Sequence, residues 1–147
     1  MTALASTATG VDPAGPGGAE ASPSMAAVVG APRAWLRLEG AAVLAAGGGL
    51  FLAAGGPWPL LVPLLLAVDV SMAGYLAGPR PGAVLYNLAH NQVVALALLG
   101  GGALCAVPLL ILAGAVLLAH TGMDRLAGYG LKYPTSVGDT HLGRIGG

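Results

Sequence analysis

Four ionisable side chains lie within or at the edge of apolar stretches of this chain, at spacings that suit acid–base chemistry. They are Asp69, His90, His120 and Asp124. His120 and Asp124 are four residues apart, the helical spacing at which a carboxylate can orient an imidazole and fix its tautomer. Such a pair suits general acid–base catalysis near neutral pH. Asp69 has no partner on its own helical stripe, so we expect its partner to come from another helix, with His90 or His120 the natural candidate.

A second set of polar side chains accompanies these four, and we predict that it binds substrate: Asn87, Tyr75, Tyr86, Glu39, Arg125, Lys132 and His141. Polar contacts that only hold helices together are the alternative interpretation. The first four residues also include enough nitrogen and oxygen ligands for a divalent ion. Because no compact ligand motif such as HExxH is present, no metal or other cofactor is predicted.

The composition places these groups in a membrane protein. Of the 147 residues, 56 % are hydrophobic and only 8 % are charged, which is typical of a multi-span membrane protein rather than a soluble domain. The formal net charge is zero, so no basic surface indicates nucleic-acid binding. The single cysteine, Cys105, excludes an internal disulfide framework. We therefore expect the lipid bilayer to be the main partner, and a hydrophobic small molecule to be a candidate ligand.

Glycine and proline residues divide the chain into three parts and four predicted spans. Residues 1–33 are rich in Ala, Gly, Pro and Ser and are predicted to be a disordered cytoplasmic tail. Because about 20 apolar residues cross a bilayer, residues 34–126 are predicted to form an all-α domain of four transmembrane helices, followed by a polar tail over 127–147. The spans are expected at about 34–54, 58–78, 81–100 and 107–126. A glycine run at 100–102 is expected to separate the last two.

The positive charges give the predicted orientation. All six Lys and Arg residues flank the predicted spans on one side, and the turns after the first and third spans contain none. The positive-inside rule therefore places both termini in the cytoplasm. At about 1.5 Å per helical residue, Asp69, Asn87, His90 and His120 all fall in the cytoplasmic half. We expect them to form one polar pocket open to the cytoplasm, on the side where residues 128–141 could cover it.

Several motifs resemble those of a known family. They are LRLEG at 36–40, DVSMAGY at 69–75, YNLAH at 86–90, HTGMDR at 120–125, GYGLKYP at 128–134 and THLG at 140–143. Together, over about residues 36–145, they resemble the small bacterial membrane proteins known as domain of unknown function 4260. Val68 stands where that family usually has proline, and Thr121 where it usually has isoleucine; neither difference removes a chemical group. The resemblance implies a four-span protein of the bacterial inner (plasma) membrane and brings no established activity.

These observations leave three functional classes open. The first is a membrane-embedded enzyme of isomerase, cyclase or hydrolase type acting on a lipid-like or isoprenoid-like molecule, with Asp69 as acid and His90 or the His120–Asp124 pair as base. The second is an oligomeric transporter of a small solute or of protons. The third is a structural or accessory membrane protein. A glycine run at 47–49 in the first predicted span would allow close helix approach and could support a homodimer.

Overall fold

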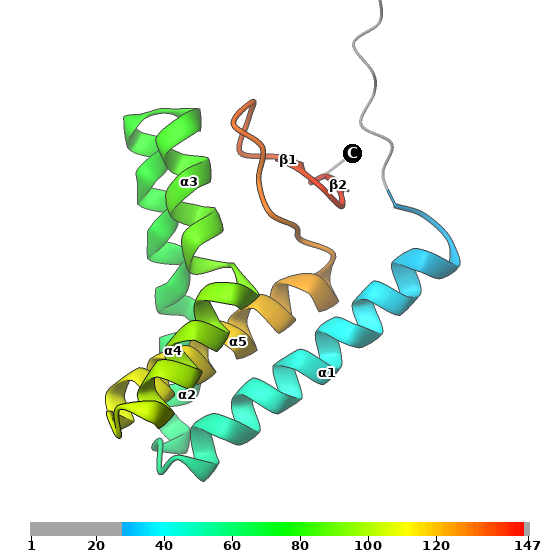
Figure 1. Cartoon of the computed structure of the whole chain (residues 1–147). Helices are drawn as coiled ribbons and strands as arrows, with labels where there is room; N and C mark the ends of the chain where they lie inside the picture. Colours follow the sequence, from blue (N-terminus) through cyan, green and yellow to red (C-terminus); the bar gives the residue numbers. More distant parts are fainter. Residues whose placement is uncertain (1–27, 146–147) are drawn as a thin grey trace, which may run out of the picture.

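The computed structural model describes residues 28–145, which form five α-helices, a segment of 3-10 helix and a short β-hairpin (Figure 1). The elements are α1 (Ala31–Ala53), α2 (Trp58–Val68), η1 (Asp69–Ala77), α3 (Pro79–Ala89), α4 (Gln92–Leu104), α5 (Pro108–Ala127), β1 (Asp139–Thr140) and β2 (Gly143–Arg144). The predicted disordered tail lies outside the described residues up to position 27, and its last residues begin α1.

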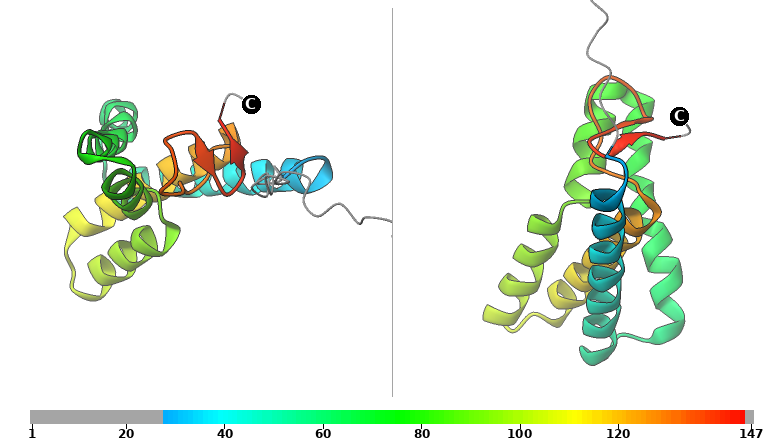
Figure 2. Two further views of the ribbon diagram at one scale, coloured as in Figure 1. Left: turned by 90° about the horizontal axis from the view of Figure 1, so that it is seen from above. Right: turned by 90° about the vertical axis from the view of Figure 1, so that its right-hand side faces the viewer.

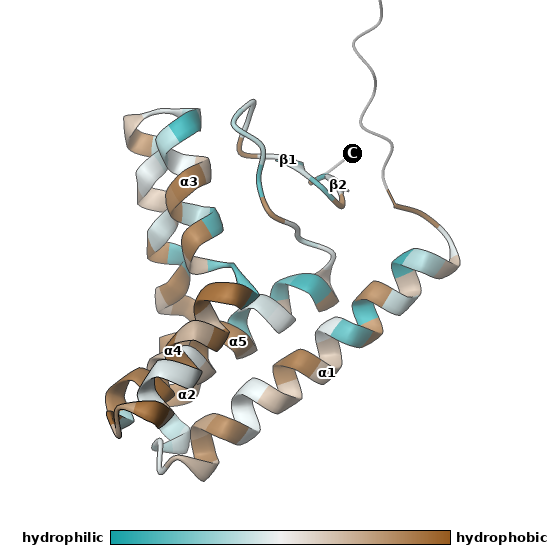
Figure 3. Ribbon diagram, viewed as in Figure 1, coloured by the Kyte–Doolittle hydropathy of each residue, from teal (hydrophilic) through white to brown (hydrophobic). Residues whose placement is uncertain are grey.

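Within residues 28–145, three helical segments are long and apolar enough to cross a membrane, and a bent pair of helices makes a fourth candidate span. The three are α1, α2 continued by η1, and α5; the bent pair is α3 and α4. Figure 3 shows hydrophilic residues gathered toward the end that carries the hairpin, and apolar residues toward the opposite end. The chain is therefore a helical protein with three to four candidate membrane spans, as the composition predicted.

The bent pair, which corresponds to the predicted span at 81–100, is broken at His90 and Asn91, where the axes of α3 and α4 differ by 44°. The side chain of Asn91 accepts the amide N–H of Val93 at 2.8 Å, which satisfies a donor at the start of α4 that would otherwise lack a partner. Irregular backbone is tolerated at membrane depth when protein surrounds it, and His90 is buried. The expectation of one continuous helix over 81–100 is therefore corrected. The expected break at 100–102 is wrong, because α4 continues through these glycines.

Helix α5 is the centre of the bundle, packed against α1, α4 and α2 (Figure 2). The buried apolar core lies along these contacts and consists of Phe51, Leu65, Ala115, Val116 and Ala119. Helix α1 approaches α5 closely because Gly47 has no side chain: a Cβ atom there would meet the backbone of Ala119. Gly49, two residues later, faces open space. Of the glycines predicted to support a homodimer, Gly47 is thus used in packing within the chain.

The tail after α5 folds back over the bundle, so that the hairpin lies between α3 and the start of α1 in the view of Figure 1. Asn87 of α3 fixes the tail by two hydrogen bonds to the backbone of Lys132: its Nδ2 donates to the carbonyl at 2.9 Å, and its Oδ1 accepts the amide N–H at 2.7 Å. Strands β1 and β2 are antiparallel, with Asp139 opposite Arg144. The tail therefore covers the part of α3 that precedes His90.

Candidate functional site

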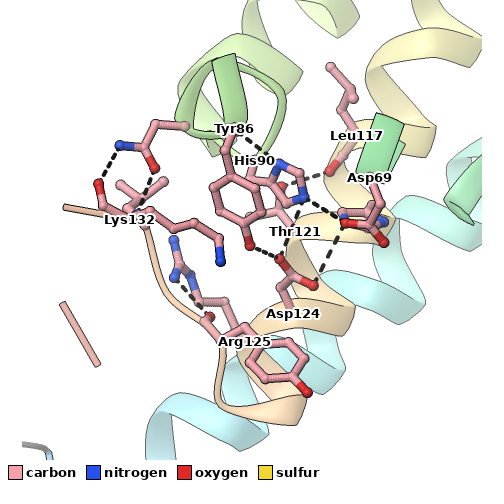
Figure 4. Close-up of polar contacts among 12 residues, drawn as sticks. Asp69, Tyr86, His90, Leu117, Thr121, Asp124, Arg125 and Lys132 are labelled. Atoms are coloured by element: carbon pink, nitrogen blue, oxygen red, sulfur yellow. Dashed lines mark hydrogen bonds and ion pairs between the residues drawn. The ribbon is translucent and has the colours of Figure 1, made fainter. Parts of the chain in front are cut away.

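Three parts of the fold bring the four predicted catalytic residues together (Figure 4). Asp69 begins η1, His90 lies at the break between α3 and α4, and His120 and Asp124 are on α5. The Nε2 atoms of His90 and His120 are 2.8 Å apart. Oδ1 of Asp69 lies 3.4 Å from the first and 3.5 Å from the second. The two histidines of other helices are thus the partners of Asp69, as expected from its lack of a partner on its own helix.

The second carboxylate approaches the same pair of nitrogens. Asp124 places Oδ2 at 3.7 Å from Nε2 of His90 and Oδ1 at 3.7 Å from Nε2 of His120. The predicted pairing of His120 with Asp124 along one helix is present at this longer separation. Two carboxylates therefore flank two imidazoles, and we call these four residues the His–Asp cluster.

Tyr86 positions two members of the cluster. Its phenolic O–H donates to Oδ2 of Asp124 at 2.6 Å, and its ring stacks on that of His90 with centroids 3.7 Å apart. Its backbone carbonyl oxygen lies 2.8 Å from Nδ1 of His90. Because a carbonyl only accepts, Nδ1 of His90 carries a hydrogen, and in the neutral ring Nε2 presents a lone pair to the cluster.

The cluster opens on one side to a cavity of about 430 Å³, lined by Asp69, Met72, Tyr86, Asp124, Tyr129, Lys132, Val137, Gly138 and Ile145. His90 and His120 are 2 % and 0 % exposed. The side chain of Asp124 is 11 % exposed, whereas that of Asp69 is 46 % exposed. Asp69 is therefore the member of the cluster that a molecule in the cavity reaches most directly.

Lys132 brings a positive charge to this cavity from the tail. Its Nζ donates to the carbonyl of Val137 at 2.7 Å and lies 4.6 Å from the centroid of the Tyr86 ring. Burial lowers the pKa of the Lys132 ammonium, while the nearby carboxylates of Asp124 and Asp69 oppose that shift. The tail thus supplies a cation beside two carboxylates, as expected if residues 128–141 cover the pocket.

The remaining predicted binding residues lie elsewhere. Glu39, Arg125 and His141 line a second cavity of about 490 Å³ between α1, the start of α4 and the tail. Asn87 is engaged by the tail backbone, and the ring of Tyr75 packs where Gly82 leaves room for it. Of the seven residues predicted to bind substrate, Tyr86 and Lys132 are the two that border the cavity beside the His–Asp cluster.

His141 serves the tail rather than the cluster. Its Nδ1 accepts the amide N–H of Leu131 at 2.9 Å. Burial and the positive charge of Arg125 lower the pKa of His141, because both disfavour its protonated form. Glu39 of α1 lines the same cavity. The neutral imidazole of His141 therefore helps to hold the tail in place.

Sequence reasoning did not find the apolar wall of the 430 Å³ cavity. Met72 comes from η1, while Tyr129, Val137 and Ile145 come from the tail. Met72 and Tyr129 lie within motifs of the family, but these motifs assign them no role, and the wall forms only when the tail folds back over α3.

A candidate metal-ligand group is present among the described residues: ligand atoms of Asp69, His90 and His120 all lie within 4.8 Å of one another.

The family of the chain follows from residues 33–145, which match the family described as Domain of unknown function (DUF4260). The chain belongs to this family. The match includes all five α-helices except the first residues of α1, the whole His–Asp cluster and the hairpin, and it confirms the resemblance carried by the motifs. No curated protein and no solved structure matches the chain. The chemistry of the site is therefore the basis for assigning a function to this DUF4260 protein.

Proposed function

We propose that this DUF4260 protein is a membrane-embedded acid–base enzyme that acts on the polar end of an amphiphilic, lipid-like or isoprenoid-like molecule. One observation carries the proposal: Asp69 is half-exposed in a cavity while its carboxylate contacts two buried imidazoles. Ionisable groups at membrane depth are costly and mark functional sites. A group that served only to hold helices together would have no need to face a cavity.

The contacts within the cluster provide a route for protons. The 2.8 Å separation of the two Nε2 atoms is within the range of about 2.6–3.2 Å for proton transfer. The contacts of Asp69 are longer, at 3.4 and 3.5 Å, and such contacts commonly shorten when substrate binds. A proton exchanged with substrate at Asp69 can therefore be shared with His90 and His120, and Asp124 stabilises the charge that results.

The cavity suits a polar group joined to an apolar one. Its volume of about 430 Å³ is within the usual range for small-molecule sites, about 300–1,000 Å³. Asp69 and Lys132 supply charges of both signs, whereas Met72, Val137 and Ile145 supply apolar contact. These walls favour an amphiphile over a small hydrophilic solute.

The test compares a catalytic variant with a matched control in lipid extracts analysed by mass spectrometry. Asp69→Asn removes the charge of the cluster's exposed carboxylate. Asp139→Asn makes the same chemical change in the hairpin, where Asp139 pairs with Arg144. Expression of the wild type and of Asp139→Asn should alter the same lipid species, and Asp69→Asn should not. An unaltered lipid profile on expression of the wild type, or an alteration that Asp69→Asn still produces, overturns the proposal. A flux of solute into proteoliposomes that is lost in Asp69→Asn would indicate a transporter instead.

We further propose that the protein lies in the bacterial inner membrane with both termini in the cytoplasm. The chain carries its own probe, since Cys105 is exposed between α4 and α5, the end expected outside the cytoplasm. A membrane-impermeant maleimide should label Cys105 in intact cells. In a Cys105→Ser background, Thr135→Cys in the tail should be labelled only after permeabilisation. The reverse pattern contradicts the orientation.

A further inference from the structure

We propose that the His–Asp cluster binds one divalent ion of the first transition series, held by Nε2 of His90, Nε2 of His120 and a carboxylate oxygen of Asp69. The three ligand atoms come from η1, the α3–α4 break and α5, so the site exists only when these elements pack together.

The distances fit an ion at the centre of the cluster. The three atoms form a triangle with sides of 2.8, 3.4 and 3.5 Å. The point in its plane that is equidistant from all three lies about 1.9 Å from each, so an ion slightly out of the plane would have bonds of about 2.0–2.1 Å, the length of Zn–N bonds in proteins. The side chains therefore need little rearrangement to bind the ion.

The lone pairs of the cluster also favour a cation between them. The hydrogen on Nδ1 of His90 leaves its Nε2 as an acceptor. This lone pair faces Oδ1 of Asp69 at 3.4 Å and Oδ2 of Asp124 at 3.7 Å. Within the cluster, Nε2–H of His120 is the one hydrogen that neutral imidazoles could offer to these acceptors. The buried lone pair of His90 is destabilised by the carboxylate of Asp124 that it faces, unless a proton or a metal ion lies between them.

The surroundings of one ligand, His90, match those of histidines in protein metal sites. Metal-binding histidines usually donate their other ring N–H to a carbonyl or a carboxylate, which fixes the ring. His90 makes this contact with the carbonyl oxygen of Tyr86 at 2.8 Å. The hydroxyl of the same tyrosine orients Asp124 at 2.6 Å. Tyr86 thus supports one ligand and the neighbouring carboxylate at once.

The donor set determines the class of ion. Imidazole nitrogens favour Zn²⁺, Fe²⁺, Co²⁺, Ni²⁺ and Mn²⁺ over Mg²⁺ and Ca²⁺, which prefer oxygen ligands alone. Asp69 is half-exposed to the cavity, so a substrate could reach an ion bound beside it. The role of the ion toward a substrate rests on the proposed function, whereas the binding of the ion does not. A bound ion would polarise the polar group of the substrate. Because it would also occupy the Nε2 lone pairs of His90 and His120, proton exchange in the metal-bound protein would pass to Asp124 and Tyr86 instead of through the two histidines.

The experiment measures metal binding by the full-length protein in detergent, purified through a tag without histidines. Elemental analysis should find about one first-row transition ion per chain. After the ion is removed with EDTA, Co²⁺ should bind with a visible absorption band, and Zn²⁺ should displace it. His90→Ala and His120→Ala should abolish this band. His141→Ala, which removes an imidazole outside the cluster, should retain it.

Asp69→Asn keeps the shape of a half-exposed side chain, so it tests the site even if the histidine variants fail to fold. We expect it to weaken Co²⁺ binding by at least about tenfold. Absence of a stoichiometric ion together with no Co²⁺ band, or wild-type Co²⁺ affinity in Asp69→Asn, overturns the assignment. Because the measurement needs no substrate, its failure leaves the proposed enzyme activity standing, and its success does not establish that activity.

Discussion

The contact between α1 and α5 at Gly47 helps to fix the position of His120. Gly47 packs on the backbone of Ala119, and Ala119 directly precedes His120 in α5. Gly47→Ala would bring a Cβ atom into the backbone of Ala119 and to 2.8 Å from the carbonyl oxygen of Ala115. Backbone atoms cannot rotate aside as a side chain does. The two helices must therefore separate at this point, and His120 must move with α5.

The expected cost follows from two opposing effects. Overpacking of a tight contact costs about 1–3 kcal/mol, and alanine in place of glycine within a helix recovers about 0.5–1 kcal/mol. Since both sides of the Gly47 contact are backbone, we expect a net loss of about 1–2 kcal/mol. Gly49→Ala is the matched control: nothing lies within 4 Å of the added Cβ atom, so this variant should be neutral or slightly stabilised.

The assay is reversible unfolding of the detergent-solubilised protein, with both variants compared with the wild type under one set of conditions. Gly47→Ala should unfold more readily and should also disturb the His–Asp cluster, whereas Gly49→Ala should do neither. Equal stability of the two variants would show that α1 and α5 do not approach at Gly47 as described.

Three further outcomes follow from the site and the tail. Tyr86→Phe should lower the free energy of unfolding by about 1.5–3 kcal/mol, because it removes a buried hydrogen bond to the carboxylate of Asp124; wild-type stability would contradict this. Asn87→Leu should release Lys132 and speed hydrogen exchange in residues 128–145 without affecting α1, and unchanged tail exchange would refute the anchor. The pKa of His141 is lowered in the folded protein, so its contribution is complete above its unfolded pKa, about 6.5, and decreases below it. The protection of the tail against hydrogen exchange, corrected for the intrinsic pH dependence of exchange, should therefore decrease as the pH falls below about 6.5, and His141→Ala should abolish that decrease.

The convergence of the cluster could be predicted because hydropathy and charge place residues at depths along their spans. Asp69, His90 and His120 fall at similar depth when counted from the charged ends, and a lone carboxylate at membrane depth needs a partner from another helix. The structure brings these three side chains into contact. Depth and helical spacing were thus sufficient to identify the partners without any knowledge of the helix packing.

The break between α3 and α4 could not be inferred from hydropathy. The segment after Gln92 carries no polar side chain up to its glycine run, which is the more obvious interruption. That run stays helical because Gly102 packs against Ile111 of α5, a contact absent from local sequence patterns. Asn91 was the available signal, because asparagine is a preferred residue before the first turn of a helix.

The position of the tail, residues 128–145, depends on contacts between residues far apart in the sequence. Asn87 and Lys132 are 45 residues apart, and no spacing rule connects an asparagine on one helix with the backbone of a later loop. Tyr86 and Asp124 are likewise separated by 38 residues. The sequence therefore predicted Tyr86 and Lys132 as polar residues near a pocket. It could not predict the hydrogen bond of Tyr86 to Asp124 or the contact of Lys132 with the Tyr86 ring.

We propose that the His–Asp cluster acts as one unit on a membrane-borne substrate. The most direct measurement compares the lipid change produced by His90→Ala, His120→Ala and the double variant. Because groups that act as a unit give non-additive losses, each single variant should lose the change, and the double variant should be no worse than either. Independent, additive losses, or single variants that keep the wild-type lipid change, would contradict the account.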